Sequence, residues 1–380
     1  MLTFVEAIKE IESRFRGKPK TKKVALVKGV NHIIAEEVYC KEDLPPLPKS
    51  TMDGFVVSSR RKNYEIKGEI TLLSNPPTHI KDDEAYQVYT GSLLPYNSLY
   101  VIKKELATVN GRVLFVKSES AFEKNFLDAG EDCKRGEPIL KKGDVLSSRA
   151  ASFIGLAGIK NVKVYKKPKV AILPIGTELI GKSGPDLTGF AIKGIARSMM
   201  VNAELIDPVP DSVDDISKTV KLLSKKHDVL LTVGGTGVSI RDLTENALLL
   251  SGGNAVFKGI KLQPGRTSGF FIFGKKPIIN LPGNAQAAVA AFFALFPKAL
   301  QAMGFMPYVK KIRAILKQKL DVEEDWAKVF FIRLENSNGC IIADPINIKP
   351  HTLKFLLDAD ALLITNKPLS EGSMVEIMLI

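Results

Sequence analysis

Cysteine and histidine are scarce in this chain of 380 residues. The three cysteines stand far apart, and the four histidines form no paired motif. This argues against a disulfide framework and against a zinc site held by side chains alone. No uninterrupted apolar run reaches the roughly 18 residues of a membrane span, and the first residues lack the basic-then-apolar pattern of a signal peptide. We therefore expect a cytoplasmic protein with no membrane partner.

The charge balance is strongly basic, with a formal net charge of +13. Hydrophobic residues make up 45% of the chain and charged residues 25%, which is typical of a globular protein with ample core. A lysine-rich solvated surface explains the charge, and steering of a polyanionic small molecule is the alternative. The basic residues form no stripe interleaved with aromatics, which argues against nucleic acid as a partner.

Changes in pattern along the chain predict several domains. Helical spacing of Phe4, Ala7, Ile8 and Ile11 predicts that residues 1–40 are mainly helical. Short β-like runs follow a proline-rich hinge, then strands and helices alternate, and further strands end the chain. The fold class is α/β plus β, in a multidomain elongated chain with a central parallel α/β domain. The predicted domains are an N-terminal linker domain (1–44 plus 139–166), an inserted β domain (45–138), the α/β domain (167–306) and a C-terminal β domain (307–380).

Three apolar runs in the α/β segment end in glycine-bearing turns, each followed by a helix-like stretch. A buried parallel strand has such a continuous apolar run. Glycine lets backbone N–H groups approach an anion, and a helix N-terminus adds positive partial charge. Because ligands bind at the carboxyl ends of strands in open α/β sheets, the turns predict a phosphate-binding site. They are Gly176-Thr177-Glu178, Gly234-Gly235-Thr236-Gly237 and Pro282-Gly283-Asn284.

Other polar residues could join this site. Asp53 and Asp132 belong to short acidic turns, Thr90 ends a β-like run, and Asp242 follows the second glycine turn. Each also has a plain structural explanation as part of a turn or a helix cap. Positive charge near the third turn comes from Lys258, Lys261 and Arg266.

Seven short motifs, in one order along nearly the whole chain, resemble the molybdopterin molybdenumtransferase family, which is MoeA in bacteria and the gephyrin E-domain in animals. The chain is identified as a divergent, archaeal-like or bacterial member. The motifs are Ser50 to Val56, Thr90 to Pro95, Gly130 to Asp132, Ile175 to Leu179, Gly234 to Asp242, Gln263 to Arg266 and Leu281 to Ala285.

The resemblance implies a transferase that inserts molybdate, or tungstate, into adenylylated molybdopterin and releases AMP, with Mg²⁺ as the cation. It also implies a homodimer, with the site between the α/β domain of one subunit and the inserted β domain of the other, and contact with other molybdenum cofactor biosynthesis proteins. The implied catalytic residues are Asp53, Glu178, Asp242 and Arg266, and the implied metal ligands are Asp53, Asp132 and Asp242. The implied cofactor-binding residues are Thr90, Asp211, Gly234, Gly235, Thr236, Gly237, Pro282, Gly283 and Asn284.

The chain departs from the family pattern at several positions, among them Thr177 for an aspartate and Gln263 for a lysine. The stretch from Gly234 to Thr244 is more similar to the related adenylyltransferase domain. Two alternatives therefore stay open. One is a molybdopterin adenylyltransferase, and the other is a non-catalytic molybdopterin-binding or scaffold homologue.

Overall fold

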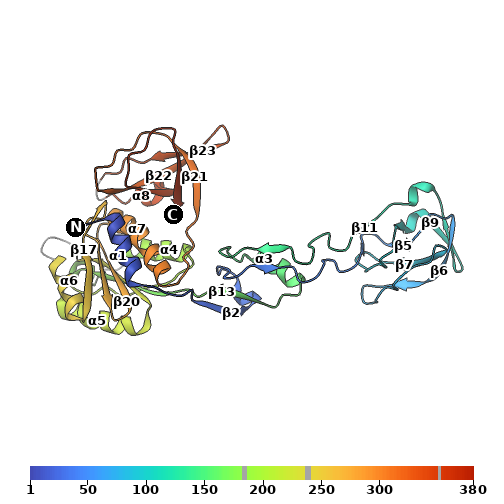
Figure 1. Cartoon of the computed structure of the whole chain (residues 1–380), viewed down its shortest axis with the longest axis horizontal. Helices are drawn as coiled ribbons and strands as arrows, with labels where there is room; N and C mark the ends of the chain where they lie inside the picture. The colour runs from blue at the N-terminus through green and yellow to red at the C-terminus, as the bar shows by residue number, and fades with distance from the viewer. Residues whose placement is uncertain (182–185, 236–240, 350–351) are drawn as a thin grey trace. The chain divides into compact units, whose positions relative to one another are not determined.

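The chain forms two compact units in a computed structural model that describes residues 1–181, 186–235, 241–349 and 352–380 (Figure 1). The larger unit comprises Met1–Lys22, Asn31–Ile33 and Val164–Ile380, and the smaller comprises Lys23–Val30 and Ile34–Lys163. Strands β2 (Thr21–Ala25) and β13 (Asn161–Tyr165) carry the chain from one unit to the other. The division into four domains stays a prediction.

The larger unit is built on a six-stranded sheet of order β15-β14-β16-β20-β19-β17. The apolar runs predicted as buried strands form its centre, and Val170 to Leu173 is fully buried. Four strands are parallel, as predicted, and β19 and β17 join by antiparallel pairing. The bounds are β14 Lys169–Ile175, β15 Asn202–Leu205, β16 Val229–Gly234, β17 Gly253–Lys258, β19 Gly269–Phe273 and β20 Lys276–Leu281.

Helices cover both faces of this sheet (Figure 1). Helices α1, α4 and α7 share one hydrophobic core with the sheet, and α5 and α6 share another on the opposite face. Helix α7 has the length and hydropathy of a membrane span, but 78% of it is buried in this unit, so the core accounts for its apolar composition. The bounds are α1 Phe4–Arg14, α4 Leu187–Ser198, α5 Val213–Lys226, α6 Arg241–Leu250 and α7 Ala285–Ala302.

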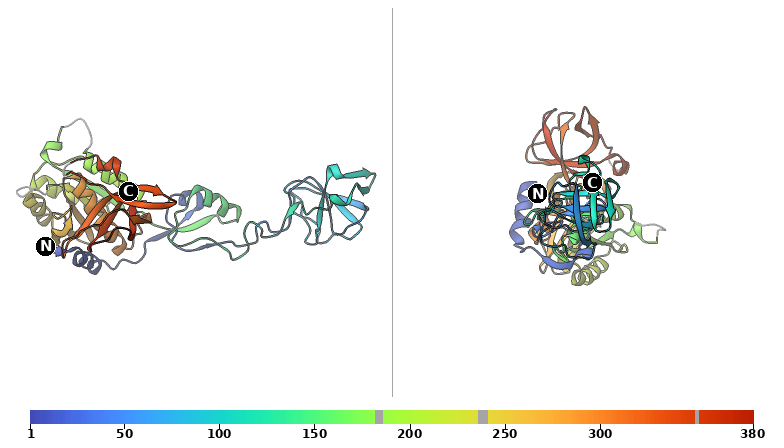
Figure 2. Two further views of the ribbon diagram at one scale, coloured as in Figure 1. Left: turned by 90° about the horizontal axis from the view of Figure 1, so that it is seen from above. Right: turned by 90° about the vertical axis from the view of Figure 1, so that its right-hand side faces the viewer.

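The C-terminal strands close into a barrel in the larger unit (Figure 2). Each of five strands pairs with two others of the set, which removes open edges. Strand β18 (Ile260–Gln263) joins this barrel by pairing with β22 and with β1 (Leu2–Thr3). The barrel strands are β21 Lys311–Leu316, β22 Ala327–Ser337, β23 Cys340–Pro345, β24 Ala361–Thr365 and β25 Met374–Leu379.

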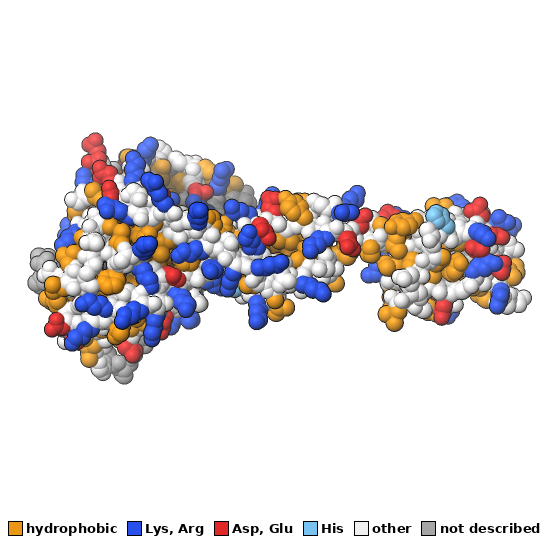
Figure 3. Space-filling view, turned by 60° about the horizontal axis from the view of Figure 1, so that its bottom comes forward, with side chains coloured by type: hydrophobic (Ala, Val, Ile, Leu, Met, Phe, Trp, Pro, Cys, Tyr) orange, Lys and Arg blue, Asp and Glu red, His pale blue; other side chains and the backbone are white. Residues whose placement is uncertain are grey.

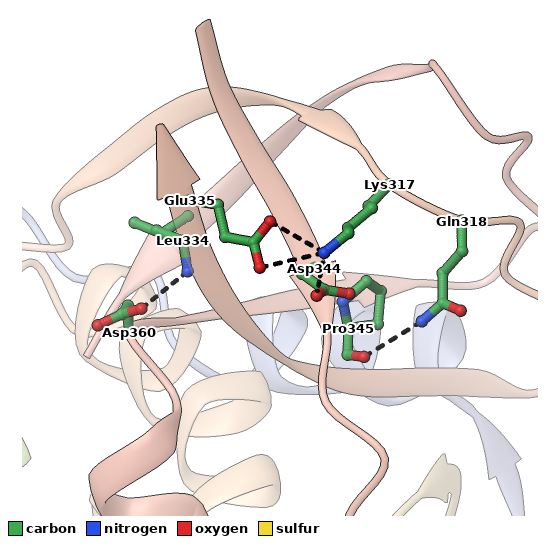
Figure 4. A network of polar contacts seen from close by, with 7 residues as sticks. All are labelled: Lys317, Gln318, Leu334, Glu335, Asp344, Pro345 and Asp360. Carbon is green, nitrogen blue, oxygen red and sulfur yellow. Dashed lines mark hydrogen bonds and ion pairs between the residues drawn. The ribbon is translucent and has the colours of Figure 1, made fainter. Parts of the chain in front are cut away.

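A polar network on the barrel surface joins three of these elements (Figure 4). The Lys317 ammonium lies 2.7 Å from Asp344 Oδ2 and 2.9 Å from Glu335 Oε2. These carboxylates, Asp344 first, raise the pKa of Lys317 above its ordinary value. The side chains are partly exposed, so the network contributes little to stability.

The smaller unit contains a six-stranded sheet of order β8-β5-β7-β6-β10-β9. The short strands predicted in this region are confirmed, and apolar clusters cover both sheet faces. The strands are β5 Gly54–Val57, β6 Asn63–Ile70, β7 Glu84–Val88, β8 Tyr100–Lys103, β9 Ala107–Asn110 and β10 Val113–Val116. Short pairs, β3 (Val38–Tyr39) with β12 (Pro138–Leu140) and β4 (Lys49–Ser50) with β11 (Phe126–Leu127), and helix α3 (Ser148–Leu156) complete the unit.

The prediction that residues 1–40 are mainly helical is wrong beyond α1. Thr3 and Glu6 form a capping box that starts α1, and the helix ends at Arg14. Gly17 follows, where an added Cβ would lie 2.1 Å from the Met303 carbonyl carbon, and Pro19 cannot continue a helix. After β2 only α2 (Leu26–Gly29) is helical. Close chain contact therefore overrides the local periodicity.

Candidate functional site

The three glycine turns meet at one open cavity of ≈ 510 Å³, at the carboxyl ends of β14, β16 and β20. We call it the glycine cavity. It brings together eight of the predicted site residues, which come from segments more than a hundred positions apart in the sequence. They are Glu178, Asp211, Gly234, Gly235, Arg266, Pro282, Gly283 and Asn284.

Backbone crowding explains the glycines at the centre of the cavity. Gly234 and Gly235 have φ values of 100° and 64°, in the region that favours glycine. A Cβ on Gly234 would lie 2.3 Å from the Ile175 carbonyl oxygen, and one on Gly283 would lie 3.3 Å from the Gly234 Cα. The three strand ends are thus packed backbone to backbone, which explains why glycine is needed there.

Asp211 is held at the cavity by the first glycine turn. Its Oδ2 accepts hydrogen bonds from the Thr177 backbone N–H at 2.9 Å and from the Thr177 hydroxyl at 3.2 Å. The Thr177 oxygen in turn accepts from the Asp211 backbone N–H at 3.1 Å. The threonine that stands where the family has aspartate therefore fixes a neighbouring carboxylate.

Two helices begin at the rim with capped N-termini. Asn284 caps α7 by accepting from the Ala287 N–H at 3.2 Å. Asp186 caps α4 by accepting from the N–H groups of Thr188 and Gly189 at 3.2 and 2.5 Å. The Thr188 hydroxyl also donates to the Gly283 carbonyl at 3.3 Å, which ties α4 to the third turn.

Asp186 lines the cavity but was not among the predicted site residues. Its position in the sequence could have indicated this, because an aspartate just before an amphipathic stretch is a common helix start. Thr267 and Gly265, beside the predicted Arg266, also line the cavity.

The cavity mixes charges of both signs. Carboxylates of Glu178, Asp186 and Asp211 line it, and Arg266 is the cation among the described lining residues. The N-termini of α4 and α7 add about half a positive charge each. Lys258 and Lys261, expected to add positive charge, lie elsewhere: their ammonium groups pair with Glu245 and Asp325 at 3.0 Å.

Asp53 and Thr90 lie together in the smaller unit. Asp53 Oδ1 accepts from the Thr90 backbone N–H at 2.7 Å and from its hydroxyl at 2.9 Å. These bonds, with the backbone one first, lower the pKa of the exposed Asp53 carboxyl, and Lys104 adds to the effect. Asp132 belongs to the same unit, where its backbone N–H donates to the Leu44 carbonyl at 2.9 Å. The structure does not show Asp53, Thr90 or Asp132 at the glycine cavity.

The remaining predicted residues fall outside what the structure describes. Thr236 and Gly237 lie outside the described residues, and Asp242 is described only as part of the α6 backbone. Among described side chains, no three His, Cys, Asp or Glu residues are close enough to enclose a metal ion. A cation here would need one or two carboxylates, waters and ligand phosphates, which is the set that Mg²⁺ accepts.

Comparisons with known proteins match both parts of the chain. Residues 2–158 match the MoeA N-terminal region (domain I and II), and residues 171–302 match a probable molybdopterin binding domain. A Methanocaldococcus jannaschii protein named for molybdopterin biosynthesis is 28% identical over 87% of this chain and 83% of its own length. A molybdopterin molybdenumtransferase of Staphylococcus aureus is 26% identical over 78% of this chain and 75% of its own.

Solved structures show the same fold. Two crystal structures of the molybdopterin biosynthesis protein MoeA of Pyrococcus horikoshii align with all of this chain, at TM-scores of 0.78 and 0.74. They are 24% and 25% identical to it, and 99% and 100% of their chains are covered.

Proposed function

Because the chain belongs to the molybdopterin molybdenumtransferase (MoeA) family, we propose that it inserts molybdate, or tungstate, into adenylylated molybdopterin with release of AMP. The observation that carries the proposal is the convergence of three glycine turns and two helix N-termini at one cavity. Such a cavity suits a ligand with two linked phosphates, because backbone N–H groups bind phosphate oxygens without a side chain.

In this proposal the phosphates of the substrate bind the N–H groups of Gly234, Gly235 and Gly283. Asn284 accepts a hydrogen bond from the Ala287 N–H and so fixes the start of α7 beside the phosphates. Arg266, at the same rim, attracts the tetrahedral oxyanion, and its planar guanidinium can bind two oxygens at once. Thr236, Gly237 and Pro282 belong to the same loops and are proposed to shape them.

Mg²⁺ is the proposed cation. When bound it neutralises charge on the phosphoanhydride whose cleavage releases AMP. Glu178 is the described acid best placed to help hold it, since an added Cβ on Gly176 would lie 2.5 Å from its Oε1, so the carboxylate lies over the first turn. Asp53, Asp132 and Asp242 remain the acids proposed from the family resemblance.

We further propose a homodimer in which Asp53 and Thr90 complete the site of the partner subunit. The support for Asp53 and Thr90 is local: the exposed Asp53 carboxylate is held in place by two hydrogen bonds from Thr90, which lower its pKa. The net charge of +13 fits steering of an anionic substrate. A cytoplasmic location and contact with other molybdenum cofactor proteins are proposed with it.

The adenylyltransferase alternative stands on one sequence feature, the Gly-Gly-Thr-Gly turn followed by Arg241 and Asp242. That reaction consumes ATP and unadenylylated molybdopterin, whereas the proposed one consumes adenylylated molybdopterin and molybdate. The scaffold alternative predicts binding of adenylylated molybdopterin with no turnover at all.

The test is AMP release by the full chain from adenylylated molybdopterin with Mg²⁺, with molybdate and tungstate compared. We expect release that depends on the added oxyanion, and no consumption of ATP with unadenylylated molybdopterin. ATP consumption would favour the adenylyltransferase, and tight binding without AMP release would favour the scaffold. Either result would overturn the proposal.

A further inference from the structure

A second open cavity, of ≈ 470 Å³, lies at the amino ends of β14 and β15, at the opposite end of the sheet from the glycine cavity. We call it the amino-end cavity. Its lining carries four cationic side chains, Lys169, Lys193, Arg197 and Lys226, together with the nearly buried His227. Among the described residues, Glu204 is its one carboxylate.

The four cations have no ion-pair partner among the described residues. Lys193 and Arg197 are four positions apart on α4, a spacing at which like charges repel each other. Figure 3 shows Lys and Arg side chains spread over the larger unit with few acidic groups among them. One further acid lies close by, because the Asp228 carboxylate accepts a hydrogen bond from the Lys169 backbone N–H at 2.9 Å.

Helix termini account for only part of this charge. The carboxyl ends of α4 and α5 contribute about half a negative charge each. Lys276 already offsets the negative partial charge at the carboxyl end of α5. Its ammonium donates to the carbonyl oxygens of Ser224 and of His227, the latter at 2.6 Å. When Lys276 is counted with the four lining cations, and Glu204 and Asp228 are counted against them, about two positive charges remain unmatched.

His227 contacts the one carboxylate of the lining. Its Nε2 lies 2.9 Å from Glu204 Oε2, and its Nδ1 lies 3.1 Å from the Leu223 carbonyl oxygen. Glu204 therefore contacts the histidine, whereas none of the four lining cations forms an ion pair with it among the described residues.

We propose that the amino-end cavity binds a dianionic tetrahedral group, either as a free oxyanion or as the phosphate end of a small molecule. Lysine ammonium groups and an arginine fork are the side chains that bind such groups. The volume also leaves room for an organic part attached to the phosphate. This inference does not depend on the proposed function.

The test is calorimetric titration of the full chain with inorganic phosphate, molybdate, AMP and adenosine. The double variant Lys193→Gln/Arg197→Gln should weaken phosphate binding about tenfold or more, since two charge-assisted contacts are lost. Glu204→Gln should tighten it, because the one carboxylate is removed while the amide can still contact His227. Lys298→Gln, an exposed α7 lysine away from the lining, is the matched control and should change nothing.

The four ligands of the titration distinguish a free oxyanion from the phosphate end of a small molecule. A free-oxyanion site binds phosphate or molybdate at least as tightly as AMP, whereas a phosphate-ester site binds AMP more tightly. In both cases adenosine does not bind the amino-end cavity, and the double variant binds the anion more weakly than the parent does.

Absence of phosphate binding in the parent, or a double variant within about twofold of the parent, would overturn the proposal. Loss of phosphate binding in Arg266→Gln instead would place the anion in the glycine cavity and also overturn it. If the double variant fails to fold, Glu204→Gln decides, since misfolding cannot tighten binding. Unchanged or weaker binding in that variant counts against the proposal.

Discussion

The two cavities of the α/β sheet have similar volumes, ≈ 510 and ≈ 470 Å³, but they differ in the source of their positive charge. The glycine cavity lies at the carboxyl ends of strands, where backbone N–H groups and two capped helix N-termini supply positive partial charge. The amino-end cavity lies where α4 and α5 end, and its positive charge comes from side chains. One sheet thus offers two ways to hold an anion.

The difference predicts different behaviour toward substitution and salt. Backbone donors cannot be deleted by exchanging a surface side chain, and their dipoles are fixed by the fold. Charges on exposed lysines are easily removed, and added salt screens them. Changes to the backbone glycines of the glycine cavity should therefore alter folding and binding together, whereas changes to the cationic side chains of the amino-end cavity should alter binding alone.

The largest effect should come from Gly234→Ala. A Cβ here meets the Ile175 carbonyl oxygen at 2.3 Å, on a residue with φ of 100°, so we expect a loss of about 3 kcal/mol in the free energy of unfolding. The control Gly274→Ala also has positive φ but open space around it, and should cost about 1 kcal/mol. Urea unfolding measures both, and equal losses would refute the backbone-packing explanation.

Arg266→Gln should weaken binding of adenylylated molybdopterin about tenfold, because the described cation of the glycine cavity is lost. Lys261→Gln is the matched control, since its ammonium pairs with Asp325 away from this cavity. We expect the control to bind like the parent in a direct titration. A larger effect from Lys261 than from Arg266 would contradict the assignment of charge.

Asp186→Ala should cost about 1 kcal/mol of stability by removing the cap of α4, whereas Asp186→Asn should be close to neutral. The asparagine variant keeps the cap but removes a negative charge from the rim. It should therefore bind the anionic substrate more tightly than the parent does. Thermal unfolding and ligand titration of the pair separate capping from charge, and equal binding would show that Asp186 does not face the ligand.

The smallest effect concerns Lys167, two residues before β14. Burial first, and then Lys22, lower the pKa of Lys167 below its ordinary value. The charged form is thus disfavoured in the folded state, and the cost is fully present below the folded pKa. The cost falls as pH rises from the folded pKa toward the unfolded value of about 10.4.

Lys167→Met should accordingly stabilise the protein at pH 7 by at most about 1 kcal/mol, because solvent screens this partly exposed group. The advantage should shrink at alkaline pH. Thermal unfolding from pH 7 to 11 checks this. An advantage that grows with pH would contradict the sign of the effect.

The sequence predicted the glycine cavity more completely than the rest. Its strands are continuous apolar runs and its turns contain glycines that no other residue could replace, so local pattern and tertiary structure agree. Asp186 was not predicted because its role depends on a single helix cap. Residues 15–40 were mispredicted because Gly17 packs against the Met303 backbone and Pro19 cannot continue a helix. Periodicity alone cannot show that close contact.

The amino-end cavity could not be predicted at all. Its cations are ordinary surface residues in three separate elements, and nothing in their spacing distinguishes them from the rest of a basic chain. The sheet order places β15 beside β14, and α5 packs against the sheet. Only this arrangement brings the cations around the amino-end cavity.

The central claim is that phosphates bind the strand-end glycines, and a crystal structure of the full chain with adenylylated molybdopterin tests it most directly. We expect phosphate oxygens within hydrogen-bond distance of the N–H groups of Gly234, Gly235 and Gly283, beside Arg266. A complex in which the phosphates lie in the amino-end cavity, or contact none of these glycines, would contradict it.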